Sequence, residues 1–301
     1  MLTVLLLVVA VLLTWPVPRL LPRLHALERV PGPALVLWQA VSLSAVFAAI
    51  CLAPLAVLQV VRDGPAIPHP AANLPMLVLG LAISGLVLGR LLVQGHRIGR
   101  NLRTARREHA ELVDVLGEPA LPVAAGGHGP LTVLAHPTPT AYCIPGRRTR
   151  VVLTDGTIRA LPDDELAAVL AHERAHLRHR HDLVLEFFTV LHTAVPRAVR
   201  SDRGLVEVRL LIELLADRMA ARAVGPVPVA RALVELAGGA HPDATLGVGG
   251  GAGGVSTAGR RLELLADPRP HRLLAAATLA AAALVIVIPG ALAWGALLGA
   301  G

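Results

Sequence analysis

The chain has 301 residues, of which 54% are hydrophobic and only 16% are charged, and its mean hydropathy is +0.62. A soluble domain carries about 25% charged residues, so this composition indicates a membrane protein. The formal net charge of +7 comes from arginines beside apolar segments, and only 2% of the residues are aromatic, which argues against a nucleic-acid-binding protein.

Four apolar segments are long enough to cross the hydrocarbon core of a bilayer, which needs about 20 residues. We predict three membrane-spanning helices in residues 1–95, at about 2–20, 34–61 and 74–94, and a fourth at 273–300. The first segment has no basic region before its apolar run, so we interpret it as a retained span rather than a cleaved signal peptide. Pro54 and Pro289 fall within these segments, where a membrane helix tolerates proline.

Basic residues flank the four segments unevenly. The segment HRIGRNLRTARRE after the third span holds five arginines, and GRRLELLADPRPHR before the fourth is basic again. The loop after the second span, RDGPAIPHPAAN, holds only one. Because cytoplasmic loops carry the excess of arginine, we predict a multi-pass plasma-membrane protein with both termini outside and residues 96–272 in the cytoplasm.

The residues that follow the third span predict a small mixed domain. Residues 101–117 are expected to continue that span as a helix that ends near Gly117. Three short β-branched segments predict a sheet, with a turn at PGRRT and a further turn at Asp155-Gly156. These segments are 131–136, 141–144 and 150–154.

Helical patterns dominate the rest of this domain. LPDDELAAVLAHERAHLRHRHD opens with acidic residues, as helix N-termini prefer. Residues 183–199 are apolar but interrupted, and we interpret them as a membrane-adjacent helix rather than a fifth span. An amphipathic helix is expected at 205–224, closed by Gly225-Pro226, and the glycine-rich residues 238–259 are expected to form a mobile loop.

Residues 172–176 carry the motif H-E-x-x-H. On a helix, positions i and i+4 share a face, so His172 and His176 can bind one zinc ion through their imidazoles. Glu173 lies beside the first of them and can act as general base on a zinc-bound water, whose pKa the metal lowers to about 7. The motif therefore predicts hydrolytic chemistry with one Zn²⁺ per chain.

A catalytic zinc has three protein ligands and one open position. The helix at 205–224 offers Glu213 as the third ligand, and Asp217, four residues further on, can accept a hydrogen bond from a ligand imidazole. Alone, this pair is more typical of a charged helix stripe with Arg209 and Arg218. Its position downstream of H-E-x-x-H favours the metal site.

Other polar residues near the motif are alternatives. Asp182, six residues after His176, occupies the place of the third ligand in metzincins. That arrangement needs a glycine where this chain has His179, so we discount it. We interpret His179 and His181 as parts of a basic helix end that faces cytosol or lipid headgroups, and His192 as a surface or packing residue.

TDGTIRALPDDELAAVLAHERAHLRHRHD and LIELLADRMAARAV resemble the integral-membrane zinc metallopeptidases of the gluzincin group. Within that group the chain is most similar to the bacterial antirepressor family, which includes β-lactam-sensing membrane peptidases. The heat-shock and prenyl-protein membrane proteases form a related family. The resemblance covers about residues 130–225, and it implies an α-helical membrane protein with a cytoplasmic α+β zincin-like metallopeptidase domain.

The same resemblance implies roles for individual residues. The zinc ligands would be His172, His176 and Glu213, with Glu173 as base and Asp217 as their support. The segment TAYCIPG, with Ala141, Tyr142 and Cys143, would form the edge strand on which substrate backbone lies by strand addition. The candidates for stabilising the oxyanion are Arg222, His192 and His241. Only Gly301 follows the fourth span, so we expect no extracellular penicillin-binding domain and no direct sensing of β-lactams.

We therefore expect a membrane-embedded zinc endopeptidase with its site at the cytoplasmic face, acting in regulatory or membrane-protein proteolysis. Its expected partners are the lipid bilayer and a protein or peptide substrate, either a cytosolic transcriptional repressor or a membrane protein, with no nucleic acid. The alternative is a catalytically silent membrane sensor or scaffold that keeps the metallopeptidase fold. The intact catalytic positions argue against that alternative.

Overall fold

The computed structural model describes residues 2–63, 74–120, 131–146, 149–236, 254–267 and 269–299. Their contacts divide the chain into two compact units. The first unit comprises Met1–Ile98, Phe188–Val208 and His271–Gly301, and the second comprises Gly99–Phe187 and Arg209–Pro270. The described part of the first unit holds long apolar helices, and the second holds the sheet and the candidate site.

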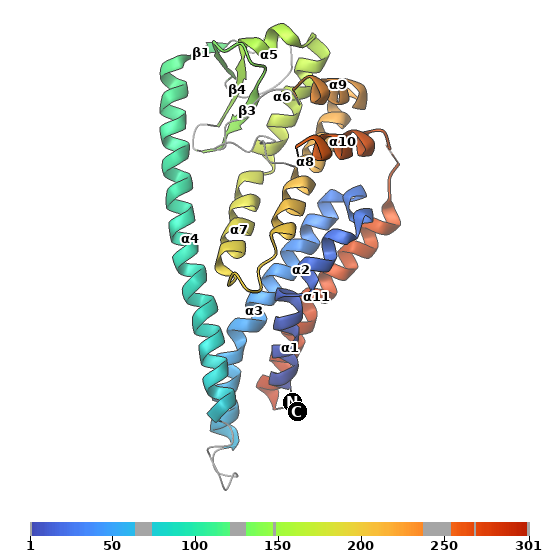
Figure 1. The fold of residues 1–301 in the computed structure, drawn as a ribbon. Helices are drawn as coiled ribbons and strands as arrows, with labels where there is room; N and C mark the ends of the chain where they lie inside the picture. The colour runs from blue at the N-terminus through green and yellow to red at the C-terminus, as the bar shows by residue number, and fades with distance from the viewer. Residues whose placement is uncertain are drawn as a thin grey trace. The chain divides into compact units, whose positions relative to one another are not determined.

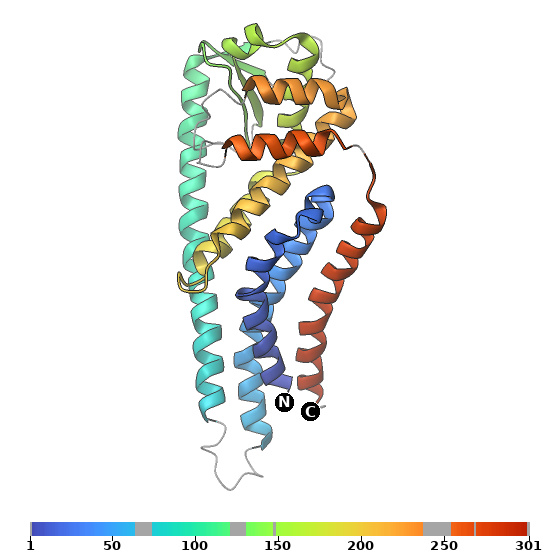
Figure 2. The ribbon, with the colours of Figure 1, turned by 45° about the vertical axis from the view of Figure 1, so that its right-hand side comes forward.

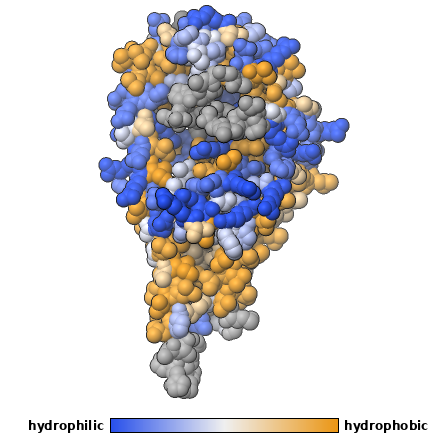
Figure 3. Space-filling model, in the orientation of Figure 1, coloured by the Kyte–Doolittle hydropathy of each residue, from blue (hydrophilic) through white to orange (hydrophobic). Residues whose placement is uncertain are grey.

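Among the described residues, four helical stretches are long and apolar enough to cross a membrane: Leu2–Arg23, Pro31–Arg62, Leu74–Leu116 and Arg272–Leu298. The first consists of α1 (Leu2–Thr14), α2 (Val17–Leu20) and the 3₁₀ turn η1 (Leu21–Arg23), which η2 (His25–Arg29) follows. The others are α3 (Pro31–Asp63), α4 (Leu74–Leu116) and α11 (Arg272–Leu298). Helices α1, α3 and α11 lie side by side in the first unit (Figures 1 and 2). Hydrophobic side chains cover the lower ends of the helices in the face that Figure 3 shows, which supports a membrane protein.

Pro54 lies inside α3 without ending it. Proline has no backbone N–H, so the carbonyl of Ile50 one turn earlier loses its usual helical donor. The Ser84 hydroxyl of α4 lies 3.1 Å from that carbonyl oxygen and 2.8 Å from the carbonyl oxygen of Ala49. A neighbouring helix thus satisfies the backbone that the proline leaves unpaired, as membrane helices require.

The predicted third span and the predicted helix at 101–117 form one continuous helix, α4, which ends at Leu116. Gly117 then begins strand β1 (Gly117–Ala120). A Cβ at Gly117 would lie 2.3 Å from Thr132 Cγ2 and 2.6 Å from the Val113 carbonyl oxygen, so only glycine fits there.

The second unit contains a four-stranded sheet in the order β1-β2-β4-β3. Strands β2 (Leu131–Leu134), β3 (Ala141–Ile144) and β4 (Arg150–Thr154) confirm the three predicted segments. Strand β4 pairs with β2 in parallel and with β3 antiparallel, which places β3 at an edge of the described sheet. The prediction missed β1, an edge strand of the described sheet. The strand contains Pro119, and a proline usually argues against a strand, although sheet edges tolerate it. The predicted PGRRT turn lies partly outside the described residues.

The prediction of a turn at Asp155-Gly156 is wrong, since these residues begin helix α5 (Asp155–Ala160). Thr154 caps this helix by accepting a hydrogen bond from the backbone N–H of Thr157. Threonine is a favoured residue at a helix N-cap, so the change from strand to helix has a local cause.

Helices cover the sheet in the second unit. Helix α6 (Asp163–Arg178) places Val169 and Leu170 against Leu153 of β4. Helices α9 (Pro226–Leu236) and α10 (Gly254–Leu265) lie side by side, and the end of α8 (Asp202–Val224) shares with them and α6 a second apolar cluster (Figure 2). The predicted helix at 205–224 and its closure at Gly225 are thereby confirmed.

Two predicted boundaries differ from the structure. The apolar segment 183–199 is helix α7, which covers His181–Ala194 and ends before Pro196. The residue before a proline disfavours the helical conformation, which accounts for this early end. The predicted glycine-rich loop is wrong at residues 254–259, which belong to α10, and its remainder from 238 to 253 lies outside the described residues.

Candidate metal centre

Helix α6 carries the H-E-x-x-H motif in its last two turns, within the second unit (Figure 1). The acidic residues Asp163, Asp164 and Glu165 in the first turn stabilise the positive end of the helix dipole. The four-residue spacing places His172 and His176 on one face, with their Nε2 atoms 3.0 Å apart. The predicted helical placement of the motif is confirmed.

Helix α8 brings a carboxylate to the same place. Glu213 Oε2 lies 3.4 Å from His172 Nε2, and Glu213 Oε1 lies 3.5 Å from His176 Nε2. One ligand atom from each of the three residues can be chosen so that all lie within 4.8 Å of one another. Residues 37 positions apart in the sequence therefore form one group that can hold a metal ion.

The chemistry of this group fits zinc. Two imidazole nitrogens and one carboxylate are a ligand set of catalytic zinc sites. His176 is only 2% exposed, and the buried Oε2 atom of Glu213 has no hydrogen-bond partner among the described residues. A buried carboxylate oxygen without a hydrogen bond is costly unless a cation lies nearby, and the Arg261 guanidinium, whose Nη1 atom is 3.3 Å from this oxygen, supplies part of that charge in addition to any bound metal.

The other imidazole nitrogens are held by neighbouring side chains. Asp217 Oδ1 lies 3.0 Å from His172 Nδ1, and His181 Nδ1 lies 3.0 Å from His176 Nδ1. Partners of this kind fix the tautomer of a ligand histidine and direct its Nε2 atom toward the metal. Asp217 thus has the contact that its spacing predicted.

The prediction that His181 faces cytosol or lipid headgroups is wrong, because its side chain is 2% exposed. Arg180 adopts a left-handed backbone conformation, with φ of 51°, where the chain turns from α6 into α7. This turn folds His181 back against His176. Its Nε2 atom is buried and has no hydrogen-bond partner among the residues that the structure describes.

Arg261 of α10 is a further residue of the centre that sequence reasoning missed. Its Nε and Nη2 atoms donate to the two carboxylate oxygens of Asp217 at 2.7 and 2.6 Å, and its Nη1 atom lies 3.3 Å from Glu213 Oε2. The residue is 3% exposed. A planar guanidinium bound to both oxygens of one carboxylate holds it in a fixed orientation.

Charge pairing decides the protonation of the two carboxylates. Burial alone would raise the pKa of Asp217, but the Arg261 guanidinium and His172 hold it well below its usual range. Burial alone would also raise the pKa of Glu213. His176, His172 and Arg261 outweigh this effect and lower that pKa to about 2. Both side chains are therefore ionised at neutral pH, as a ligand and its supporting residue must be.

The pKa values of the two ligand histidines, His172 and His176, shift in opposite directions. Burial would lower the pKa of His172, but the adjacent carboxylates of Asp217 and Glu213 outweigh it and raise the pKa to about 10. Burial dominates at His176, whose pKa falls to about 3. In the metal-free protein, His172 therefore carries a proton near neutral pH and His176 does not.

Glu173 points toward the sheet edge. Its carboxylate is hydrogen-bonded to the Cys143 thiol of β3, and burial raises its pKa. Burial, followed by the negative charge of Glu173, also raises the pKa of that thiol. The three residues assigned to substrate binding, Ala141, Tyr142 and Cys143, lie on this edge strand with buried side chains.

Among the described residues, the metal-binding group does not include the other candidates. Asp182 is buried and pairs with Arg106 at 3.5 Å, whereas His179 is exposed, as expected. His192 belongs to the first unit, where it pairs with Asp202 at 3.0 Å. Of the three oxyanion candidates, Arg222 is exposed and His241 lies outside the described residues.

An H-E-x-x-H helix whose two imidazoles converge on a carboxylate from a second helix defines the class of zinc-dependent metallopeptidases. A comparison with protein families matches residues 107–290 to Peptidase family M48, which is more than half of the chain. The chain belongs to this family. Its members are in general zinc-dependent, and the family assignment supports a zinc protease.

Two curated proteins are similar to parts of the chain. The plastoglobule-localized metallopeptidase 48 of Arabidopsis thaliana chloroplasts is 36% identical over 120 residues, which cover 36% of this chain and 35% of that protein. An HtpX protease homologue of Methanopyrus kandleri is 40% identical over 62 residues, 20% of this chain and 19% of that protein. The matches thus span about a third and a fifth of these relatives. No solved structure matches the chain.

Proposed function

We propose that the chain is a membrane-embedded zinc endopeptidase in which His172, His176 and Glu213 hold the metal. The observation that carries this proposal is the convergence of these three ligand atoms, with the buried carboxylate of Glu173 beside them. When bound, zinc would supply an activated water and polarise the carbonyl of the peptide bond.

The protein side chains transfer the proton, orient the zinc ligands and bind the substrate. Glu173 takes the proton of the attacking water and passes it to the leaving amine, and its raised pKa brings it closer to the working pH. Asp217 and His181 keep the two imidazoles oriented, and Arg261 keeps Asp217 in place. A substrate backbone would pair with β3, an edge strand of the described sheet, whose Cys143 is in hydrogen-bond contact with the base.

The arginines that follow the apolar part of α4 support a cytoplasmic location of the second unit, with both termini outside a plasma membrane. A site on that side would cut a cytosolic repressor or the cytoplasmic part of a membrane protein. We propose regulatory or membrane-protein proteolysis on this basis, in line with the resemblance to the antirepressor family.

The experiment that tests the function uses the full chain in detergent and a library of peptides from a digested proteome. We expect new peptide termini with the zinc-loaded chain, none after chelation, and recovery when zinc is added back. A chain that binds zinc but yields no new termini from any peptide would favour the silent scaffold instead.

Zinc binding is expected to become tighter as pH rises through the neutral range. The pKa of His172, raised to about 10 in the metal-free protein, means that this residue must lose a proton before it can bind zinc. Between pH 7 and 8, both below that pKa, the affinity should rise about tenfold, with about one proton released per zinc. Calorimetric titration in buffers of different ionisation enthalpy measures both quantities. An affinity that does not change over this interval would show that His172 is not a ligand.

A further inference from the structure

A pocket of about 230 Å³ lies within the first unit. Its walls come from α1, α2, α3 and α4 and from residues 188–205, which run from α7 into α8. The walls are mainly apolar, with Val41, Ala45, Ile83, Val87, Leu191 and Leu205 among them. The volume is more than ten times the roughly 10–15 Å³ that one water molecule needs, and apolar walls favour hydrocarbon over water.

The walls of this pocket are fixed by close packing and by hydrogen bonds. Trp38 is 4% exposed and packs against Gly204, where a Cβ would come within 3.1 Å of the indole ring. Arg90 of α4 donates from Nη2 to the carbonyl of Thr193 at 3.1 Å and from Nε to the carbonyl of Ala194. These contacts tie α4 to the end of α7, so the pocket is formed before any ligand binds.

The pocket opens on the apolar surface of the helices. Leu86 lines it and is 54% exposed on α4, one of the helices that are long enough to cross a membrane. In a bilayer, the material next to such a surface is the acyl chains of lipids. A chain of this kind can enter the pocket from the side.

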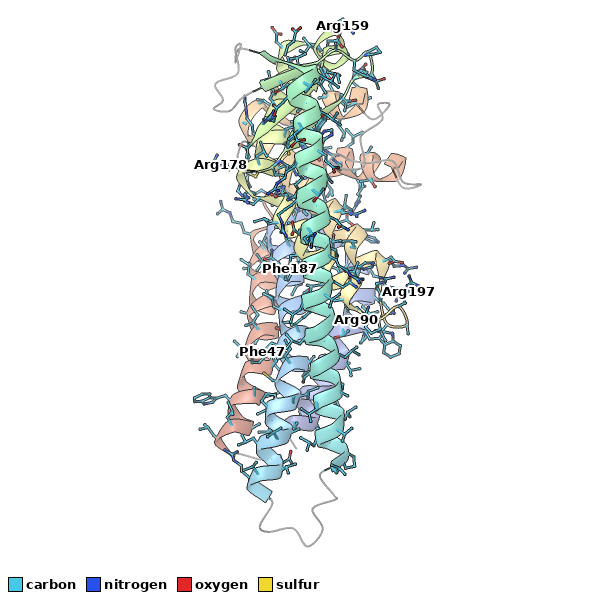
Figure 4. The ribbon with its side chains drawn as sticks, turned by 90° about the vertical axis from the view of Figure 1, so that its left-hand side faces the viewer. Phe47, Arg90, Arg159, Arg178, Phe187 and Arg197 are labelled. Carbon is cyan, nitrogen blue, oxygen red and sulfur yellow. The ribbon has the colours of Figure 1, made fainter. Side chains whose placement is uncertain are left out.

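One part of the pocket is positively charged. Arg90 and Arg200 line it, and Arg19 donates to the Arg200 carbonyl at 3.2 Å. Arg90 lies part way along α4, at the level of the segment that carries Arg197 (Figure 4). The hydrogen bonds described for Arg19 and Arg90 go to neutral carbonyls, and neither arginine forms an ion pair with an acidic side chain in the part of the chain that the structure describes.

Residues 188–205 contain one acidic residue, Asp202, and it is already engaged. Asp202 pairs with His192 at 3.0 Å and is largely exposed to solvent. Arginine binds phosphate oxygens through several N–H groups, and Arg90 keeps donors beyond the two that bind carbonyls. The pocket therefore matches a molecule with a long apolar chain and an anionic head.

We propose that this pocket binds an anionic phospholipid, with one acyl chain between α3 and α4 and the phosphate against Arg90 and Arg200. The lipid fills the space between the α7–α8 segment and the helices of the first unit. An apolar peptide segment would fill the same walls but would leave the arginines without an anion. The proposal does not depend on peptidase activity.

The test is native mass spectrometry of the full chain in detergent, with added phosphatidylglycerol or with phosphatidylcholine of the same acyl chains. We expect one phosphatidylglycerol to stay bound per chain and phosphatidylcholine to bind roughly tenfold more weakly, because its cationic choline cancels the headgroup charge and is repelled by the two arginines. Arg90→Gln should weaken phosphatidylglycerol binding to a similar degree.

Arg62→Gln is the matched control. Arg62 also donates to the carbonyls at a helix end, those of Ala296 and Leu297 in α11, but it does not line the pocket. This variant should keep the lipid. Ala45→Phe fills the pocket without a charge change and should displace the lipid even if Arg90→Gln loses its fold by circular dichroism.

Equal retention of the two lipids would overturn the proposal. So would unchanged phosphatidylglycerol binding in Ala45→Phe, or in a folded Arg90→Gln variant. An equal loss in Arg62→Gln would do the same, because it would show a general effect of removing an arginine.

Discussion

Glu173→Gln is expected to lower the rate of peptide cleavage by about 10²- to 10⁴-fold, the usual contribution of a general base. Glutamine has nearly the shape of glutamate but cannot accept the proton of the attacking water. Since Glu173 is not in the group that holds the metal, zinc should remain bound. The rate is measured on any peptide that the native chain cuts.

Asp164→Asn is the matched control for this variant. Asp164 lies on the same helix and makes the same change from acid to amide, but it is exposed in the first turn of α6. It should leave the rate within about twofold of the native value, since exposed sites away from special features have small effects. Equal losses in both variants would mean that charge on α6, rather than the base, accounts for the effect.

Arg261→Met is expected to destabilise the second unit by about 3–5 kcal/mol, because it leaves two carboxylates buried without their shared cation. Methionine keeps most of the side-chain volume, so little of this loss comes from a cavity. The two carboxylates, Asp217 and Glu213, are 1% and 8% exposed. Hydrogen exchange of the α6 and α8 amides measures the loss as faster opening of these helices.

The neighbouring Arg260 provides the control. It pairs with Glu263 at 2.6 Å, but that carboxylate is 68% exposed. Surface pairs contribute about 0–1 kcal/mol, so Arg260→Met should change the exchange little. The double variant Asp217→Leu, Arg261→Met should recover part of the lost free energy of unfolding, because it removes both charges of this pair and does not leave Asp217 buried without its cation. Similar exchange in the two single arginine variants would contradict a buried ion-pair network.

The parts of the site that the sequence predicts are those within one helix. His172, Glu173 and His176 occupy one motif, and the helical period alone places the two imidazoles together. Glu213 and Asp217 follow from the same period on a second helix, since a third ligand and its support were needed. Which helices contact each other depends on the tertiary structure and cannot be read from the helical period. The need of a catalytic zinc for a third ligand indicated that α8 contacts α6.

The parts that the sequence did not predict depend on contacts between distant segments. Arg261 contributes to a basic segment before the fourth span, where an orienting charge was the simpler interpretation. Its true partner, Asp217, is 44 residues away, and no local pattern connects the two. A basic residue within an apolar helical pattern, as in RRLELL, was the available signal of burial.

His181 was missed for a different reason. The run of histidines and arginines after His176 has the composition of an exposed helix end. The left-handed turn at Arg180 reverses this expectation by starting α7 directly at His181. Non-glycine residues rarely adopt this conformation, so sequence patterns seldom predict it.

The central claim is that a zinc ion held by His172, His176 and Glu213 acts together with Glu173 to cut peptide bonds. Zinc content and cleavage rate, measured on the same preparations of the native and Glu173→Gln chains, test it most directly. The expected result is about one zinc per chain in both, with cleavage by the native chain alone. A Glu173→Gln chain that cuts at the native rate, or a native chain that cuts without zinc, would contradict it.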